Sequence, residues 1–298
     1  MARTRFRSDR GLTARMGTVG VLLVVVYLGF GALLITYSSS IAFGIVVVVA
    51  LAWGQWFFSA KLAMASMRAR EVTPEQAPEL HGMIDRLCAL ADMPKPRVAI
   101  ADTDMPNAFA TGRTPEKAVV CVTTGILRRL DSEEMEGVLS HELAHVANRD
   151  VAIMTVASAM GLLAGFITRW GLYFGGGRRN NNNGAPAFIV VWLVSLVAYA
   201  ISFLLTRALS RYRELSADRC GAYLTGKPSA LASALTKITG DMGQIPTRDL
   251  REAAHMNAFF FTPAIKGQQL TALIATHPSL QKRLDELAKV AADLGRPM

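Results

Sequence analysis

The chain has 298 residues, of which 51% are hydrophobic and 18% are charged, and its formal net charge is +9. An ordinary soluble protein of this length is less apolar, so the composition argues against a soluble enzyme and favours a membrane protein. Because the positive charge coexists with long apolar runs and with no nucleic-acid-binding motif, we expect no nucleic acid partner and attribute the charge to contact with an anionic lipid bilayer.

The first predicted element is a transmembrane hairpin over residues 16–59. It follows a basic N-terminal segment, residues 1–15, in which five arginines stand against one acid. The uncharged run from Met16 to Tyr37 has about the length that crosses a bilayer, and a second uncharged run, 41–59, follows a turn of three serines. A signal peptide is the alternative, which we disfavour because the apolar run is long and lacks a clear cleavage site.

Basic residues flank this hairpin on both sides. Residues 1–15 precede it, Lys61, Arg68 and Arg70 follow it, and the serine turn between its two runs is uncharged. Because positively charged flanks stay on the cytoplasmic side of a membrane, we predict that the N-terminus and the residues after 60 are cytoplasmic.

Residues 60–150 are predicted to be the first part of a soluble domain that contains a small sheet. The predicted elements are an amphipathic helix at 75–90 and strands at 97–101, 107–112 and 118–123. Asp131 followed by Glu134 is typical of a capping box, so this pair predicts the start of a further helix.

The helix that begins at Asp131 contains the sequence His-Glu-Leu-Ala-His at 141–145. His141 and His145 are four residues apart and share one helix face, so both imidazoles can reach one metal ion. Glu142 lies beside that ion, where it can take a proton from a metal-activated water. This is the H-E-x-x-H arrangement of zinc metalloproteases, and it predicts one Zn²⁺ per chain.

Residues 151–205 are predicted as a second membrane hairpin. Two apolar runs, 151–168 and 187–205, enclose a low-complexity loop at 175–186 that we expect to be flexible. Arg169 cuts the first run short, and two arginines in the loop oppose an external location. Packing of these segments on the soluble domain, or a re-entrant hairpin, therefore stays open as an alternative.

Residues 206–298 are predicted to complete the soluble domain. The predicted helices are 210–225, 228–239 and 279–294. A catalytic zinc needs a third protein ligand, and the histidines at 81, 255 and 277 as well as many acids remain available. The first of these helices presents Glu214 and, four residues later, Asp218. Glu214 can bind zinc, while Asp218 can accept the outer N–H of a ligating histidine and orient its ring.

Four motifs together resemble the HtpX family of membrane-embedded zinc metallopeptidases, relatives of the CAAX prenyl proteases. They are Pro-Asn-Ala-Phe-Ala-Thr-Gly-Arg at 106–113, Ser-His-Glu-Leu-Ala-His at 140–145, the segment 210–218, and Thr-His-Pro at 276–278. The resemblance implies an α-helical membrane protein with an α+β, gluzincin-like catalytic domain, made mostly of helices plus a small sheet.

The resemblance also implies roles for individual residues. The implied zinc ligands are His141, His145 and Glu214, with Glu142 as general base and Asp218 turned toward His141. His277 resembles a family position that donates to the developing oxyanion. Asn107 lies on what resembles the edge strand that pairs with the substrate backbone.

The implied activity is zinc-dependent cleavage of misfolded or damaged membrane proteins, as in protein quality control and the stress response. We expect polypeptide substrates, a multi-pass location in a bacterial-type inner membrane, and a catalytic domain that faces the cytoplasm. The three cysteines lack CxxC spacing, which fits such a reducing compartment.

Other functions stay open at this point. A CAAX-type processing peptidase would use the same chemistry on prenylated peptides. A non-catalytic, zinc-stabilised membrane scaffold would usually lack a general base, yet Glu142 is present. A transporter or channel would need ionisable residues inside its spans, and residues 16–59 contain none.

Overall fold

The structure is a computed structural model, and it describes the chain except residues 1–9, 38–40, 159–160, 162–163, 166–183 and 243–276. The described residues are mostly helical, with one small sheet. The elements, in chain order, are α1 (Arg10–Tyr37), α2 (Ile41–Ser66), β1 (Arg70–Glu71), α3 (Pro78–Ala91), β2 (Arg97–Ala101), β3 (Ala108–Thr111), η1 (Pro115–Lys117), β4 (Val119–Thr123), α4 (Thr124–Arg129), α5 (Ser132–Ala147), α7 (Gly184–Thr225), α8 (Pro228–Met242) and α11 (Leu280–Asp293).

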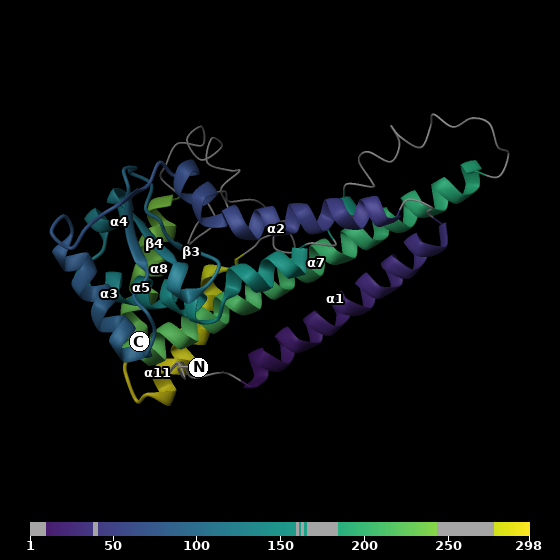
Figure 1. Cartoon of the computed structure of the whole chain (residues 1–298). Coiled ribbons are helices and arrows are strands. Elements are labelled where there is room, and N and C mark those ends of the chain that lie inside the picture. Colours follow the sequence, from purple (N-terminus) through teal and green to yellow (C-terminus); the bar gives the residue numbers. More distant parts are fainter. Residues whose placement is uncertain (1–9, 38–40, 159–160, 162–163, 166–183, 243–276) are drawn as a thin grey trace.

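Long helices project from one side of the folded part, by which we mean the sheet together with α3, α4, α5, α8 and α11 (Figure 1). Among the described residues, two helices are long and apolar enough to cross a membrane, over Arg10–Ala32 and Ile189–Thr225. α7 has 42 residues and is therefore about 63 Å long, twice the roughly 30 Å of a bilayer core. Its apolar first half suits a membrane, and its second half continues into the folded part.

The continuity of α7 differs from the sequence prediction, which treated 187–205 and 210–225 as separate elements. No glycine or proline lies between Ala187 and Cys220, so nothing in the sequence ends the helix. One rigid helix therefore joins the apolar segment to the residues around Glu214.

α1 packs along α7 through small apolar clusters. Val19 and Leu23 are buried together with Ala157 and with Leu209 of α7, and the Tyr27 hydroxyl donates a hydrogen bond to the carbonyl oxygen of Ala157. The opposite face of α1 is apolar and open, with Val21, Val24, Val25 and Leu28 each more than half exposed. An apolar face of this size suits lipid contact.

The sheet has the strand order β1-β2-β4-β3. β2 runs parallel to β4, while β1 and β3 are antiparallel to their neighbours. The three strands predicted from sequence are present, and the short β1 is an addition. Among the described strands, β3 lies at one edge and pairs only with β4, with Ala110 opposite Val120. No strand among the described residues pairs with its other side, so an extended chain can add there.

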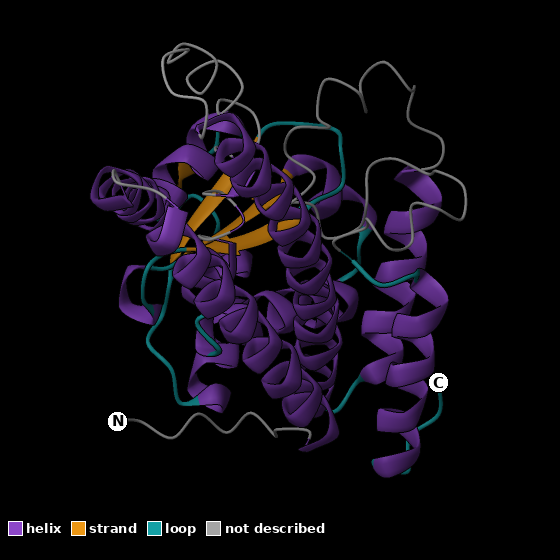
Figure 2. Cartoon of the chain, turned by 90° about the vertical axis from the view of Figure 1, so that its right-hand side faces the viewer, coloured by secondary structure: helices purple, strands orange, loops and turns teal. Residues whose placement is uncertain are grey.

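Helices cover both faces of the sheet (Figure 2). The main core joins the sheet to α3, α5, α8 and α11; its fully buried members include Ile84, Leu87, Val120, Val122, Leu139, Leu143, Leu231, Leu235 and Leu287. On the other face, Ala63 and Met67 at the end of α2 pack on Phe109 and Cys121. The end of α2 thus lies beside the edge strand.

α5 lies at the centre of the folded part. The predicted capping box at its start is confirmed, because the Asp131 side chain accepts from the backbone N–H of Glu134 and Glu134 accepts from that of Asp131. Glu134 also accepts hydrogen bonds from Ser233 and Lys237 of α8, at 2.5 and 2.7 Å. These contacts fix α5 in place and with it the two histidines near its end.

Candidate metal centre

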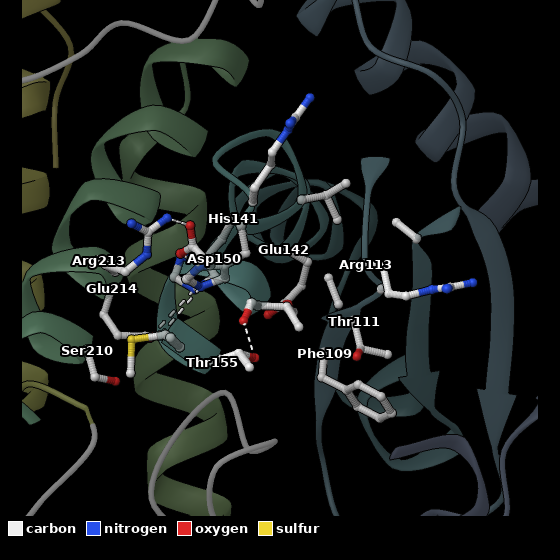
Figure 3. A pocket seen from close by; sticks show the side chains of 18 of the residues that line it. Phe109, Thr111, Arg113, His141, Glu142, Asp150, Thr155, Ser210, Arg213 and Glu214 are labelled. Carbon is white, nitrogen blue, oxygen red and sulfur yellow. Dashed lines mark hydrogen bonds and ion pairs between the residues drawn. The ribbon is translucent and has the colours of Figure 1, made fainter. Parts of the chain in front are cut away.

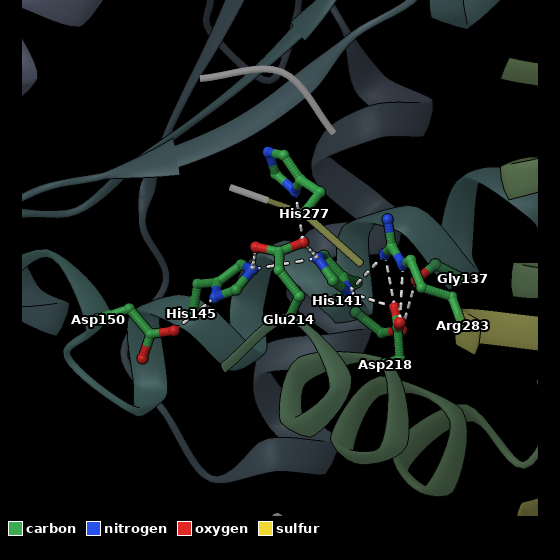
Figure 4. A network of polar contacts seen from close by, with 9 residues as sticks. Gly137, His141, His145, Asp150, Glu214, Asp218, His277 and Arg283 are labelled. Atoms are coloured by element: carbon green, nitrogen blue, oxygen red, sulfur yellow. Dashed lines mark hydrogen bonds and ion pairs between the residues drawn. The ribbon is translucent and has the colours of Figure 1, made fainter. Parts of the chain in front are cut away.

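Two imidazoles of α5 and one carboxylate of α7 converge in the interior (Figure 4). The Nε2 atoms of His141 and His145 are 3.1 Å apart. Glu214 Oε1 lies 3.4 Å from the His145 Nε2 atom, and Glu214 Oε2 lies 3.7 Å from that of His141. The three potential ligand atoms all lie within 4.8 Å of one another.

This spacing fits a single metal ion. Two nitrogens bound to zinc at 2.0–2.1 Å in tetrahedral geometry would be about 3.3 Å apart, close to the separations of the three donor atoms. The Glu214 Oε2 atom is buried and has no hydrogen-bond partner among the described residues, so its lone pairs are available. Two neutral imidazoles and a carboxylate form a donor set suited to zinc and similar divalent transition metals, with room for a further ligand.

Asp218 contacts the outer ring nitrogen of His141, the one that faces away from the two other potential ligands. The Asp218 Oδ1 atom lies 2.9 Å from the Nδ1 atom of His141. Arg283 of α11 donates to both carboxylate oxygens of Asp218, at 2.6 and 2.7 Å, and only 2% of Arg283 is exposed. The family resemblance implied that Asp218 faces His141, whereas Arg283, which completes the contact, was not predicted from the sequence.

His145 has a corresponding carboxylate partner, which was not predicted from the sequence. The Asp150 Oδ2 atom lies 2.6 Å from His145 Nδ1, and Asp150 forms an ion pair with Arg213 of α7. Arg213 also donates to the carbonyl oxygen of Asn148 at 3.2 Å. Asp150 follows Arg149, whose positive φ of 55° turns the chain back toward the end of α5. The only hint in the sequence was an acid five residues after a ligating histidine.

Glu142 is buried and lies beside the histidines. Burial raises the pKa of Glu142 to about 7, although His145 and a backbone hydrogen bond with Ala110 of β3 act in the opposite direction. A carboxyl group with a pKa near neutrality can both accept and release a proton under physiological conditions. The contact with Ala110 places this group next to the free edge of β3.

Burial and nearby positive charge shift the pKa values of Glu214 and Asp218 in opposite directions. Burial raises the pKa of Glu214, but His277 and His145 lower it more, so it lies well below the usual range. Burial likewise raises the pKa of Asp218, while Arg283 and His141 lower it below its usual value. Both groups are therefore ionised at neutral pH, the form required for a metal ligand and for an acceptor of an imidazole N–H.

The two remaining site residues of the sequence analysis lie at different places. The His277 Nδ1 atom is 2.9 Å from Glu214 Oε2 but without hydrogen-bond geometry, and neither ring nitrogen has a hydrogen-bond partner among the described residues. Asn107 precedes β3, is fully buried, and its backbone pairs with Thr123 of β4. The cleft beside the histidines is lined by His277 but not by Asn107.

The cleft has a volume of about 580 Å³ and lies between β3 on one side and α7 on the other (Figure 3). Residues 108–114 form one wall, and Ser210, Arg213 and Glu214 form part of the other. His141, Glu142 and His145 line it between these walls. An extended chain in this cleft would lie along the free edge of β3 and pass the metal centre.

Comparisons with known proteins agree with this geometry. Residues 74–291 match the family model described as peptidase family M48. The chain is 57% identical over 297 residues to "Protease HtpX homolog 1" of Streptomyces coelicolor, with 98% of this chain and 97% of that protein covered. It is 51% identical to "Protease HtpX homolog" of Moorella thermoacetica, with 98% of each chain covered.

The crystal structure of S. mikatae Ste24p has a similar fold. Its TM-score to this chain is 0.55, and the superposition covers 94% of this chain and 67% of Ste24p. Because the sequences are only 16% identical, this likeness concerns the fold alone.

Proposed function

The chain belongs to peptidase family M48 and is a membrane metalloprotease, and we propose that it is a zinc-dependent endopeptidase that cleaves misfolded or damaged membrane proteins. The observation that supports this most directly is the convergence of His141, His145 and Glu214 in a cleft beside the free edge of a strand. Metal ligands, a buried acid and a site for an extended chain are what peptide hydrolysis requires.

His141, His145 and Glu214 are the proposed zinc ligands. When bound, zinc supplies a Lewis acid and lowers the pKa of a coordinated water to about 7. The protein holds the two imidazoles through Asp218 and Asp150, which accept the N–H of each outer nitrogen and thereby leave both Nε2 atoms deprotonated. Glu214 adds one negative charge, so the ligand set does not neutralise a divalent ion completely.

Glu142 is the proposed general base. Its carboxylate takes a proton from the attacking water and later delivers it to the leaving amine, which its pKa of about 7 allows. His277 lines the same cleft, with its Nδ1 atom 2.9 Å from Glu214 Oε2 and its Nε2 atom without a hydrogen-bond partner among the described residues, so Nε2 is the atom that would donate a hydrogen bond to the oxyanion formed during attack. No covalent intermediate is required.

Substrate recognition is proposed to occur along β3. An extended chain can add to its free edge through backbone hydrogen bonds, which accept many sequences. The family resemblance implied that Asn107 lies on this edge strand. Because Asn107 is buried and directly precedes Ala108, we assign it a role in holding the start of β3, and the pairing edge is then Ala108–Thr111.

The proposed topology is multi-pass, with the catalytic domain in the cytoplasm of a bacterial-type cell. Hairpins at 16–59 and 151–205 would cross the inner membrane, and 60–150 together with 206–298 would form the catalytic domain. The predicted loop at 175–186 lies outside the described residues except for the first turn of α7. Basic residues at the folded end of the long helices support the cytoplasmic orientation.

The decisive experiment is Glu142→Gln in the full chain, purified in detergent with its zinc content measured. We expect one zinc per chain and loss of cleavage of an unfolded soluble protein, because the ligands remain while the base is absent. Glu136→Gln, an exchange elsewhere on α5, is the matched control and should keep its activity. Cleavage by Glu142→Gln at the wild-type rate would refute the assigned base, and absence of zinc from the wild type would refute the assigned metal.

A further inference from the structure

The cleft does not end at the metal centre but continues toward the long helices. Its further lining consists of Leu62 on α2, Met154, Thr155 and Ser158 on the helical segment 150–158, and Arg207 and Ser210 on α7. Met154, Thr155 and Ser158 are spaced as neighbours on one helix face. Val156, which follows Thr155, faces away from the cleft, since it is 71% exposed and does not line the cleft. Three helices thus border this end of the cleft.

This end of the cleft lies at the level where apolar helix gives way to polar helix. Arg207 is the first charged residue after the apolar run 187–205, and its guanidinium lies 4.8 Å from the ring centroid of Phe203. On α2, Lys61 is the first charge after an apolar run, and it adjoins Leu62. Arginine and lysine at the end of an apolar helix mark the boundary between hydrocarbon and headgroups.

The rim of the cleft at this level is apolar. Leu62 is 60% exposed, and Phe58, one turn earlier on α2, is 43% exposed. On the segment 150–158, Ile153 is 40% exposed beside the cleft residue Met154. An apolar rim in water is unfavourable, whereas at a bilayer surface it is continuous with the lipid.

β3 leads from this rim to the general base. At its C-terminal end, the guanidinium of Arg113 lies 4.1 Å from the ring centroid of Phe57 on α2, so this end reaches the long helices. In the middle of the strand, Ala110 contacts Glu142. A chain paired with β3 would therefore have one end at the apolar rim and its middle at the metal centre.

We propose that the cleft receives its substrate from the bilayer side, as an extended segment that directly adjoins a membrane helix of the substrate. This inference rests on the proposed proteolytic function and adds the route of entry and the part of the substrate that enters. The adjoining segment enters between α2 and the segment 150–158 and extends along β3 past Glu142. A polypeptide that remains anchored in lipid is also presented at a high effective concentration, of the order of millimolar for a short connection.

The test uses cysteine cross-linking in vesicles that contain the full chain with Glu142→Gln. The substrate probe is a single membrane-spanning helix with an unstructured polar segment and one cysteine in the first residues after the helix. Ser158→Cys, in the cleft, is compared with Val156→Cys, two residues away on the same helix but facing outward. The native Cys88, Cys121 and Cys220 are buried and contribute little background.

We expect a disulfide cross-link to the anchored probe at Ser158→Cys that exceeds that at Val156→Cys by about tenfold. Leu62→Cys, on the opposite side of the rim, should cross-link as well and provides a second position if Ser158→Cys does not fold. The same polar segment without its membrane helix should cross-link far less at either cleft position. Equal cross-linking at Ser158→Cys and Val156→Cys, or equal cross-linking of the anchored and unanchored probes, would overturn the proposed route.

Separate measurements distinguish this inference from the proposed function. The zinc content and the cleavage of an unfolded soluble protein by the wild type test the peptidase itself. If these hold while the cross-linking pattern does not, only the route of entry is wrong. If wild-type protein binds no zinc and cleaves nothing, the proposed function fails whatever the cross-links show.

Discussion

At the scale of single residues, each imidazole of the candidate metal centre is held by its own carboxylate and arginine. His141 contacts Asp218, which is held by Arg283, and His145 contacts Asp150, which pairs with Arg213. Both carboxylates are buried, and a buried carboxylate is stable only when it is paired and hydrogen-bonded. The arginines therefore keep the carboxylates ionised, and the carboxylates orient the rings.

The contact between Asp150 and His145 predicts an effect on metal affinity. In Asp150→Asn the amide oxygen is a weaker acceptor for the imidazole N–H, so the ring loses basicity and orientation. We expect the affinity for zinc to fall about 10- to 100-fold, as measured by competition with a coloured chelator. Asp104→Asn is the control, because the Asp104 side chain is 91% exposed and does not line the cleft. An unchanged zinc affinity in Asp150→Asn would mean that Asp150 does not contribute to metal binding.

The sequence predicted the parts of the centre that lie within one helix. The spacing of His141 and His145, and that of Glu214 and Asp218, follow from the period of an α-helix. The spacing left open which histidine Asp218 would contact; the family resemblance implied His141, and the two side chains lie 2.9 Å apart in the structure. Asp150 and Arg283 were missed because their positions depend on a turn after α5 and on the docking of α11, which no local pattern reveals.

At the scale of elements, the centre depends on how closely α7 approaches α5. A Cβ atom at Gly221 of α7 would lie 2.8 Å from Ser140 Oγ and 3.0 Å from the backbone nitrogen of His141. The absence of a side chain at Gly221 thus permits the approach that brings Glu214 and Asp218 to the histidines. The position is one turn beyond Asp218, so a change there is transmitted to the carboxylates.

Gly221→Ala should therefore impair the enzyme without altering a ligand. The added methyl group has to displace α5 or α7, which we expect to destabilise the fold by about 1–3 kcal/mol and to reduce proteolysis about 10- to 100-fold. Gly82→Ala on α3 is the matched control, since its added Cβ would have no neighbour within 4 Å beyond the adjacent backbone of its own helix, and alanine favours a helix. Thermal unfolding and peptidase assays measure both variants. Equal stability and equal activity of Gly221→Ala and Gly82→Ala would contradict the proposed close packing of α7 on α5.

The junction between α5 and α8 gives a second prediction at this scale. Glu134→Ala removes half of the capping box and the acceptor for Ser233, so the free energy of unfolding should fall by about 1–2 kcal/mol. Glu133→Ala, at the neighbouring position with a 66% exposed side chain, should change it by less than about 0.5 kcal/mol. Thermal unfolding in detergent measures both. A loss in Glu133→Ala as large as that in Glu134→Ala would contradict the assignment.

The effect of Glu134 should also depend on pH. Burial raises the pKa of Glu134, but the hydrogen bonds from Lys237 and Ser233 lower it more, so the folded-state value lies below the unfolded one. Such a group stabilises the fold fully above the unfolded pKa, about 4.3, and loses this contribution as the pH falls through the folded value. The charge-dependent part of the difference between wild type and Glu134→Ala should therefore be constant from pH 6 to 8 and decrease below about pH 4.

Element boundaries illustrate what sequence patterns leave undetermined. The strands at 97–101, 107–112 and 118–123 were predicted from their β-rich composition, yet the strand order, which puts β3 at the free edge, is a tertiary property. The charged residues after position 206 suggested a break that α7 does not have. Polarity changes there because the helix leaves one environment and enters another, while its backbone continues.

At the scale of the whole molecule, charge and apolar surface are separated along the long helices. α1 begins, and α2 and α7 end, at the folded part, whereas their other ends point away from it (Figure 1). The basic residues of these helices lie at the folded end: Arg10 and Arg15 on α1, Lys61 on α2, and Arg207 and Arg211 on α7. The outward face of α1 between these ends is apolar and exposed.

This separation predicts the orientation of the protein in the membrane. Because basic flanks stay on the cytoplasmic side, the folded part should face the cytoplasm, and surface positions on different helices of that part should be accessible from the same side. Glu79→Cys on α3 and Lys289→Cys on α11 are both exposed positions. A membrane-impermeant maleimide should label both in inside-out vesicles and neither in sealed right-side-out vesicles.

Val25→Cys, 60% exposed on the apolar face of α1, should stay unlabelled in both preparations because lipid covers it. Labelling of Glu79→Cys and Lys289→Cys from the outer side would show that the protein has the opposite orientation. Efficient labelling of Val25→Cys would mean that α1 lies in water. The physical basis for substrate entry from the bilayer would then be lost.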